Sequence, residues 1–255
     1  MVDDMQPARV LRNQLLSALP AIEQRRILPV LQPTIFSTGQ IISEPGQRAA
    51  YGYFPTGSLV ALLYTTQDGA TVEMGLIGND GVIGTAIFLG GESTVSRAIV
   101  ALGGSALKVP AQVLSREFAC AGPLQRLLLL YTQAFLTQVS QTAVCNRLHA
   151  IEQRLCRWLL LCQDRTNSAE LRLTQELIGN MLGGRRESVT VAAGRLQDAG
   201  LIHYCRGQIR ILDRLGLESN ACECYRVVAD ELNRLFGRKR TCELSQPGLA
   251  LREAV

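Results

Sequence analysis

The side chains best suited to metal binding and thiol chemistry lie in the second half of the chain. All eight cysteines follow residue 119, and the two histidines are His149 and His203. Cys145 and His149 stand four residues apart in a helical segment, where they could hold a metal ion or haem, or Cys145 could sense an oxidant. Cys222 and Cys224 are too close together for a zinc site without two further ligands. Because the sequence shows no complete ligand set, we expect no metal site and regard the cysteines as packing residues.

The strongest functional pattern begins at Leu173. Thr174 is suited to cap a short helix with an apolar face. Gly183-Gly184 then makes a break of the length found in helix-turn-helix motifs, and a second helix is predicted over residues 186–198. Arginine can bond guanine with two N–H groups, glutamate can accept from cytosine, and serine or threonine can contact phosphate or base. The residues predicted to contact DNA, including two in the following hairpin, are Thr174, Gln175, Arg185, Arg186, Glu187, Ser188, Thr190, Arg206 and Arg210.

A hairpin is predicted directly after this second helix. Leu201–Cys205 and Gln208–Leu212 have strand character and flank Arg206-Gly207, which suits a two-residue turn. A hairpin in this position is the wing of a winged helix-turn-helix. We expect Arg206 and Arg210 to lie near the phosphate backbone while the start of the helix enters the major groove.

The first half of the chain predicts the elements that would control this surface. Residues 8 to about 31 have helical spacing of leucines and isoleucines. From Thr34 to about Pro110, short strand-like runs alternate with turn signals every 8–12 residues. Asp68-Gly69 joins two of these runs as a plausible hairpin. The pattern predicts a jelly-roll-like antiparallel β-roll whose interior could hold a small ligand.

A long helix is predicted from residue 123 to about 148. Its apolar residues recur every three or four positions, which is typical of a helix that packs against another helix. We expect the partner to be the same helix of a second copy, because the apolar surface exceeds one face; packing on the chain's own β-roll is the alternative. The residues predicted at this dimer interface are Leu124, Leu128, Tyr131, Phe135, Val139 and Thr142.

The order of these elements and the segment Arg186-Glu187-Ser188-Val189 resemble the Crp/Fnr superfamily of bacterial transcription regulators. The resemblance covers roughly residues 10 to 235 and implies an α+β fold. Its parts would be an N-terminal β-roll of the cyclic-nucleotide-binding type, a long dimerisation helix and a C-terminal winged helix-turn-helix. It further implies a homodimer on an inverted-repeat site in double-stranded promoter DNA, with contacts to RNA polymerase. Val191 stands where the cyclic-AMP-responsive members carry a second arginine, so a different half-site is expected.

The β-roll departs from the family pattern for cyclic AMP. Gly84-Thr85 stands where the resemblance implies Gly-Glu, so the carboxylate for the ribose hydroxyl is missing, and Arg97 is out of register. We therefore expect a different small-molecule effector or none. No cysteine precedes residue 120, so the N-terminal iron–sulfur ligands of Fnr-like members are absent. The residues expected to line an effector site are Gly84, Thr85, Glu92, Arg97 and Ser140.

Length and composition set the remaining limits. The chain has 255 residues, a net charge of +4 and 47% hydrophobic residues, which fits a multi-domain globular protein. The predicted divisions are 1–122 for the effector domain, 123–149 for the dimerisation helix, 150–238 for the DNA-binding domain and 239–255 for a tail. The acidic start predicts no signal peptide, and no apolar run is long enough to span a membrane. We expect a cytoplasmic protein with reduced thiols.

Two classes of function remain open. With two histidines and no phosphate-binding glycine pattern, the sequence gives no support for an enzyme. The favoured function is a DNA-binding transcription regulator. The alternative is a small-molecule sensor module that acts through protein partners rather than DNA.

Overall fold

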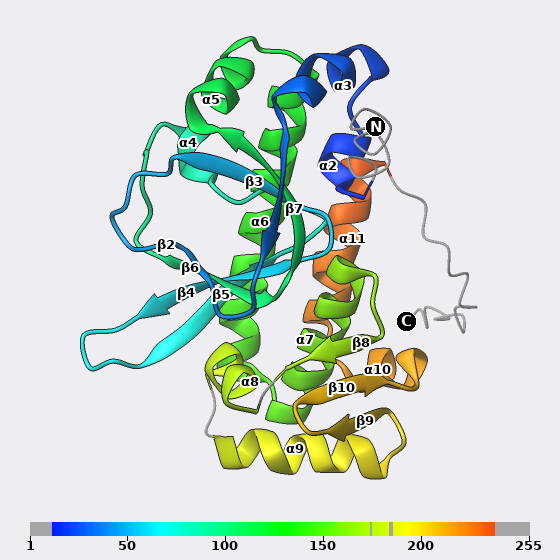
Figure 1. The fold of residues 1–255 in the computed structure, drawn as a ribbon. Coiled ribbons are helices and arrows are strands. Elements are labelled where there is room, and N and C mark those ends of the chain that lie inside the picture. Colours follow the sequence, from blue (N-terminus) through cyan, green and yellow to red (C-terminus); the bar gives the residue numbers. More distant parts are fainter. Residues whose placement is uncertain (1–11, 174, 184–185, 238–255) are drawn as a thin grey trace, which may run out of the picture.

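The computed structural model describes residues 12–173, 175–183 and 186–237 (Figure 1). The predicted N-terminal helix consists of short pieces: α2 (Gln14–Ser17), α3 (Ala21–Ile27) and the 3-10 helix η1 (Leu28–Val30). Asn13 caps α2 by accepting from the backbone N–H groups of Leu15 and Leu16. Its side-chain amide donates to the carbonyls of Pro55 and Gly81, and the residue is fully buried. This asparagine therefore fixes the N-terminal helices to the sheet region.

Two antiparallel sheets form the predicted β-roll. One has the order β1-β7-β3 and the other β2-β6-β4-β5. The hairpin predicted at Asp68-Gly69 is confirmed, since β4 pairs antiparallel with β5 on either side of it, and the short helix α4 (Thr85–Leu89) follows that hairpin. The strands are β1 (Gln32–Phe36), β2 (Ile41–Ser43), β3 (Tyr51–Pro55), β4 (Leu59–Thr65), β5 (Thr71–Ile77), β6 (Arg97–Leu102) and β7 (Gly104–Pro110).

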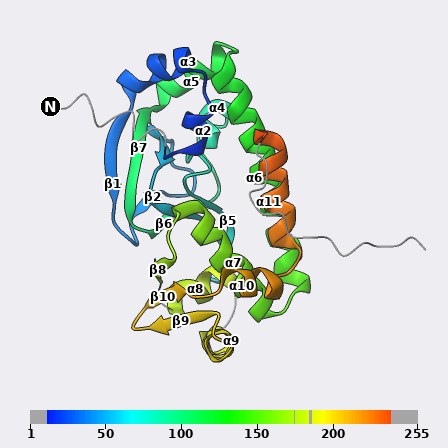
Figure 2. The ribbon, with the colours of Figure 1, turned by 90° about the vertical axis from the view of Figure 1, so that its right-hand side faces the viewer.

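Helix α5 (Ala111–Ala119) leads into the long helix α6 (Pro123–Leu148), whose bounds agree with the sequence prediction. Pro123 occupies the first turn of α6, where its missing N–H costs nothing. Figure 2 shows α6 between the β-roll and the last helix, α11 (Cys224–Phe236). One side of α6 thus faces the roll, and a second side faces α11 of the same chain.

The C-terminal part combines helices with a small sheet of order β8-β10-β9. Strand β8, which the sequence pattern did not predict, pairs with β10 of the hairpin. The elements are α7 (Ile151–Thr166), β8 (Glu170–Arg172), α8 (Gln175–Leu182), α9 (Arg186–Asp198), β9 (Ile202–Cys205), β10 (Gln208–Ile211) and α10 (Arg214–Asn220).

The apolar core is continuous between the roll and the C-terminal part. Leu63 and Leu76 of the roll belong to the same buried cluster as Trp158 and Leu159 of α7. One buried cluster joins the two sides of the predicted boundary at residue 150. The division into domains at that residue therefore stays a prediction. The α+β class, the β-roll, the long helix and the winged helix-turn-helix are all confirmed. Within the described residues, no helix has the length and apolar character needed to cross a membrane.

Candidate nucleic-acid interface and effector cavity

Helices α8 and α9 form the predicted helix-turn-helix. Ile178 and Leu182 of α8 are buried with Val189 and Leu196 of α9 in the common core. Gly183 ends α8 with a φ of +57°, a left-handed conformation that glycine adopts without a steric penalty. Of the predicted DNA contacts, Thr174 and Arg185 lie outside the described residues. The backbone of Gln175 begins α8, but its side chain is not among those described.

The N-terminal half of α9 presents its polar side chains to solvent. Arg186, Glu187, Ser188 and Thr190 are all exposed. The Thr190 hydroxyl donates a 3.0 Å hydrogen bond to the carbonyl of Arg186, so its lone pairs stay available to a ligand. In Figures 1 and 2, α9 lies along one end of the molecule, and no described element covers its outer side. The structure therefore brings together four of the predicted contact residues on one accessible surface.

The wing lies beside this surface. Arg206 and Gly207 form its turn with φ values of +47° and +76°. Two positive φ angles are typical of a type I′ turn, whose twist matches that of the flanking strands. Arginine in this conformation costs about 1 kcal/mol or more, and strain of this kind is often retained where a side chain has a function. Arg206 and Arg210 are both exposed, as the sequence prediction requires.

Polar contacts hold α9 in a fixed position. The side-chain oxygen of Gln197 accepts a 2.8 Å hydrogen bond from the backbone N–H of Tyr204 in β9. Arg195 forms an ion pair with Glu152 of α7. The recognition helix is thus tied both to the wing and to the helix that precedes it.

The β-roll contains a cavity of about 240 Å³ that brings together three of the five predicted effector residues. Gly84, Thr85 and Glu92 line it, whereas Arg97 and Ser140 do not. Arg97 instead pairs with Glu44, with 2.8 Å between Nε and Oε2. Ser140 is exposed on α6. Arg97 and Ser140 therefore do not line this cavity, and their assignment to an effector site stays a prediction.

The predicted dimer residues of α6 mostly face inward. Leu124, Leu128, Tyr131 and Thr142 are each 5% exposed or less within a single chain. Phe135 and Val139 are half-buried, and Phe135 packs against the clusters of the roll. These residues therefore belong to the core of their own chain, and the alternative interpretation, a helix packed on its own β-roll, holds for this face. A three-and-four spacing cannot distinguish the two faces of a helix when both are apolar.

A buried polar network that the sequence pattern did not reveal connects the roll to α6 and α7. The indole N–H of Trp158 donates to Glu73 of β5 at 2.7 Å. Nε of Arg165 lies 3.0 Å from Oδ2 of Asp80, and Arg165 also bonds the side chain of Gln138 on α6. All five residues are at least nine-tenths buried. The available sequence signal was a pair of arginines, Arg157 and Arg165, on either side of the apolar run 158–162 of α7.

Burial controls the charge of Glu73. Desolvation raises the pKa of its carboxyl to about 7, against the opposing effects of the Trp158 hydrogen bond and of Arg157 and Arg165. A carboxyl with this pKa is neutral in weakly acidic solution and becomes charged in weakly basic solution. The contact between the roll and α7 is therefore sensitive to pH.

Comparison with known proteins agrees with the helix-turn-helix arrangement of α8 and α9. Residues 153–219 match the family model described as the Crp-like helix-turn-helix domain. No curated protein sequence matches the chain significantly.

Three solved structures share the fold. FixK2 from Bradyrhizobium japonicum is 19% identical, with a TM-score of 0.65 over 76% of this chain and 98% of that one. A CRP-family regulator from Thermus thermophilus is 19% identical, with a TM-score of 0.61 over 74% and 96%. The c-di-GMP-responsive regulator CLP from Xanthomonas campestris is 16% identical, with a TM-score of 0.60 over 75% and 99%. The chain therefore has the fold of the Crp/Fnr transcription regulators and carries their Crp-like helix-turn-helix domain at residues 153–219.

Proposed function

We propose that this protein is a sequence-specific DNA-binding transcription regulator rather than an enzyme, and that it acts in the cytoplasm. The observation that carries the proposal is the exposed start of α9, where Arg186, Glu187 and Ser188 stand together beside an arginine-bearing wing. An α-helix fits the major groove, and the N-terminal residues of a recognition helix reach the base edges. Contact with RNA polymerase at a promoter is part of the proposal, as the resemblance implies.

The residues divide into two roles. Arg186 can donate two hydrogen bonds to guanine, and Glu187 can accept from the amino group of cytosine. Val191 lies on the same helix and is 54% exposed, which suits contact with a thymine methyl group. Arg206 and Arg210 on the wing would bind phosphate, which positions the protein on the duplex without selecting sequence.

A homodimer is the second part of the proposal, and the surface of α6 supports it. Leu129 and Leu136 are 47% and 61% exposed, and they stand seven residues apart. A two-helix seam has apolar residues spaced three and four apart. The exposed stripe of α6 has that spacing, and its apolar residues Leu129, Leu136 and Ala143 alternate with polar ones. The whole stripe consists of Arg126, Leu129, Gln133, Leu136, Ser140, Ala143 and Arg147. The partner helix would be α6 of a second copy, so that two recognition helices read an inverted repeat.

A small-molecule effector at the β-roll is the third part. Tyr51, Tyr53 and several aliphatic side chains line the cavity. Arg48 is the one cation among its described lining residues, and it pairs with Glu92 at 2.7 Å. A cyclic phosphate would have to break this ion pair, so we favour an uncharged effector.

The test of DNA binding is the salt dependence of affinity for a labelled duplex of mixed sequence, measured by fluorescence anisotropy with the full chain. Binding to phosphates releases counterions, so affinity should fall steeply as salt rises. Arg206→Ala and Arg210→Ala should each lower the slope of log K against log salt by about one unit.

The matched control is Arg116→Ala, which removes the same charge from an exposed site on α5. Helix α5 lies at the opposite end of the molecule from α9 (Figure 1). The control should bind as the parent does. Absence of binding at low salt, or wing variants that match the control, would favour the alternative in which this surface binds a protein.

A further inference from the structure

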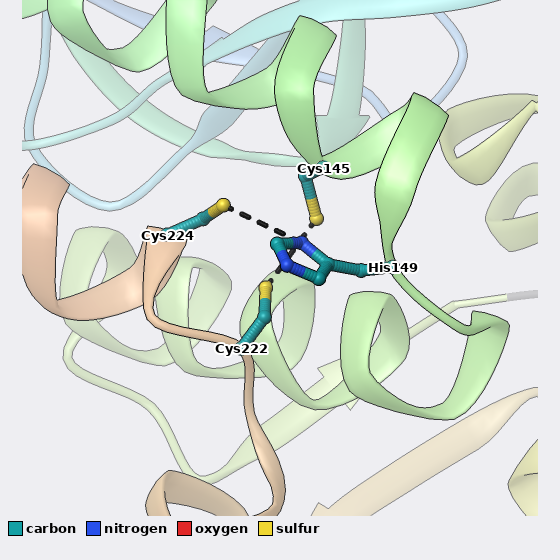
Figure 3. A group of neighbouring side chains, drawn as sticks. All are labelled: Cys145, His149, Cys222 and Cys224. Atoms are coloured by element: carbon teal, nitrogen blue, oxygen red, sulfur yellow. Dashed lines mark hydrogen bonds between the residues drawn. The ribbon is translucent and has the colours of Figure 1, made fainter.

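Four side chains that are far apart in the sequence meet at the end of α6. Cys145 and His149 come from the last turn of α6 and its C-cap. Cys222 comes from the link between α10 and α11, and Cys224 is the first residue of α11 (Figure 3). Their ligand atoms all lie within 4.8 Å of one another. The three cysteines are almost completely buried, and the His149 side chain is 14% exposed. The structure thus supplies the two further ligands that Cys222 and Cys224 lack in the sequence.

The distances within this cluster fit a single ion. Sγ of Cys145 lies 3.5 Å from Sγ of Cys222, and Sγ of Cys224 lies 3.6 Å from Nδ1 of His149. Zinc bonds sulfur at about 2.3 Å and nitrogen at about 2.0 Å in tetrahedral sites. Those bond lengths place neighbouring ligand atoms roughly 3.5–3.8 Å apart. We propose that Cys145, His149, Cys222 and Cys224 bind one tetrahedral Zn²⁺ ion.

The second ring nitrogen of His149 provides independent support. Nε2 lies 3.3 Å from a carboxylate oxygen of Glu223. Histidine ligands of zinc typically donate their other ring N–H to a carboxylate, which fixes the tautomer and aims the free nitrogen at the metal. Glu223 therefore orients Nδ1 of His149 toward the three cysteines.

A buried arginine supplies the matching charge. Zinc with three thiolates and a neutral imidazole carries one net negative charge. Arg157 is 3% exposed, interacts electrostatically with Cys145 and Cys224, and forms no ion pair with a carboxylate of the described residues. Its Nη2 group donates to the hydroxyl of Thr142 at 2.6 Å, and its Nε has no hydrogen-bond partner in the described structure. Buried charges are normally paired. The zinc–thiolate centre would give Arg157 a negative partner in addition to Glu73, with which Arg157 also interacts electrostatically.

Two other arrangements of the cysteines fit less well. A disulfide needs its sulfur atoms about 2.05 Å apart, whereas Cys145 and Cys222 are separated by 3.5 Å. An iron–sulfur cluster binds its ligands through several iron atoms, which spreads the ligand atoms wider than this compact group allows.

The proposed ion would connect the end of α6 to the start of α11. Between His149 and Cys222 the chain contains α7 to α10, which include the whole helix-turn-helix and wing. Metal binding that closes a long loop stabilises the folded state by restricting the unfolded chain. The zinc would thus hold the C-terminal helix against the dimerisation helix, next to the point where the DNA-binding elements begin.

The test is measurement of the metal content of the full chain, purified without a histidine tag under reducing conditions, by elemental and native mass spectrometry. One zinc per chain is expected. Cys222→Ser and Cys224→Ser should each lower the bound zinc at least tenfold, and Glu223→Gln should weaken zinc binding by about 10–100-fold. The matched control is Cys205→Ser, which changes an exposed cysteine on β9 and should retain one zinc.

A second measurement does not depend on the folding of variants. Titration of the metal-free parent chain with Co²⁺ should give the visible absorption of tetrahedral cobalt–thiolate at one equivalent, and zinc should abolish it. The proposal fails if the parent retains no zinc and gives no cobalt spectrum. It also fails if the metal is iron with labile sulfide, or if alkylation and mass mapping show a Cys145–Cys222 disulfide in the freshly purified chain.

Discussion

The indole Nε1 of Trp158 donates a 2.7 Å hydrogen bond to Oε2 of Glu73, and both side chains are buried. This bond joins α7, the helix that leads into the DNA-binding elements, to β5 of the roll. A second buried contact also joins α7 to the roll: the ion pair of Arg165 with Asp80, which follows β5. Two buried polar contacts therefore join the roll to the helix that precedes the DNA-binding elements.

The pH dependence of stability follows from Glu73. Burial raises its pKa from the usual 4.5 to about 7 in the folded chain, so between these values the folded state holds a proton that the unfolded state has lost. The contribution of Glu73 to the free energy of unfolding therefore falls as pH rises through this window. We expect Glu73→Gln to gain about 1–3 kcal/mol relative to the parent between about pH 5 and pH 8.

Denaturant unfolding followed by the fluorescence of Trp158, the single tryptophan, measures this difference directly. The matched control is Glu44→Gln, which removes a carboxylate from a partly exposed ion pair on the roll. A constant offset between Glu73→Gln and the parent across the whole pH range would show that Glu73 titrates at its ordinary value.

The sequence predicts elements best where the signals are local. The turn at Arg206-Gly207 and the glycine that ends α8 are both contained within a few residues, and the structure places both as expected. The bounds of α6 follow from Pro123 and from its apolar spacing for the same reason. Each of these features depends on the conformational preferences of neighbouring residues, which a sequence displays directly.

Contacts over long separations had no such signal. The hydrogen bond of Trp158 with Glu73 spans 85 positions, and the approach of Cys145 to Cys222 spans 77. The faces of α6 were also assigned wrongly, because periodicity shows that Leu128 and Leu129 lie on different sides but not which one faces the chain's own core. Only the tertiary arrangement decides these questions.

The exposed stripe of α6 predicts how the dimer can be broken. Replacing Leu129 and Leu136 together with glutamate places charges on both sides of a two-fold seam, so monomers are expected by multi-angle light scattering. The control is the pair Ile22→Glu and Leu89→Glu, two exposed apolar residues outside α6, which should leave a dimer. A Leu129/Leu136 variant that keeps the dimer mass would show that the interface lies elsewhere.

Replacement of Arg206 is expected to raise the stability of the chain and to lower its affinity for DNA. Asparagine adopts positive φ more readily than arginine and is favoured before glycine in a type I′ turn. Arg206→Asn should therefore stabilise the chain by about 0.5–1 kcal/mol while it weakens binding to every DNA sequence. Thermal unfolding and anisotropy of the same sample provide both values, and Arg210→Ala should lose affinity with no gain in stability. A destabilised Arg206→Asn would mean that the arginine side chain supports the fold.

Cyclic AMP should not bind at micromolar concentrations. Thr85 has no carboxylate to accept from a ribose hydroxyl, and Arg97 pairs with Glu44 outside the cavity. Isothermal titration calorimetry of the full chain should show no saturable heat, for the parent and for Arg97→Ala alike. A micromolar dissociation constant in the parent that is lost in Arg97→Ala would place the phosphate at this arginine and overturn the assignment.

Base reading by α9 can be measured by selecting binding sites from a random duplex library with the full chain and sequencing them. We expect an inverted repeat with half-sites about one helical turn apart. Arg186→Ala should lose preference at one position of each half-site, at a cost of about 1–3 kcal/mol, whereas Arg206→Ala should select the parent motif. Failure to enrich any sequence, or an Arg186→Ala motif identical to that of the parent, would contradict the proposal that α9 reads DNA.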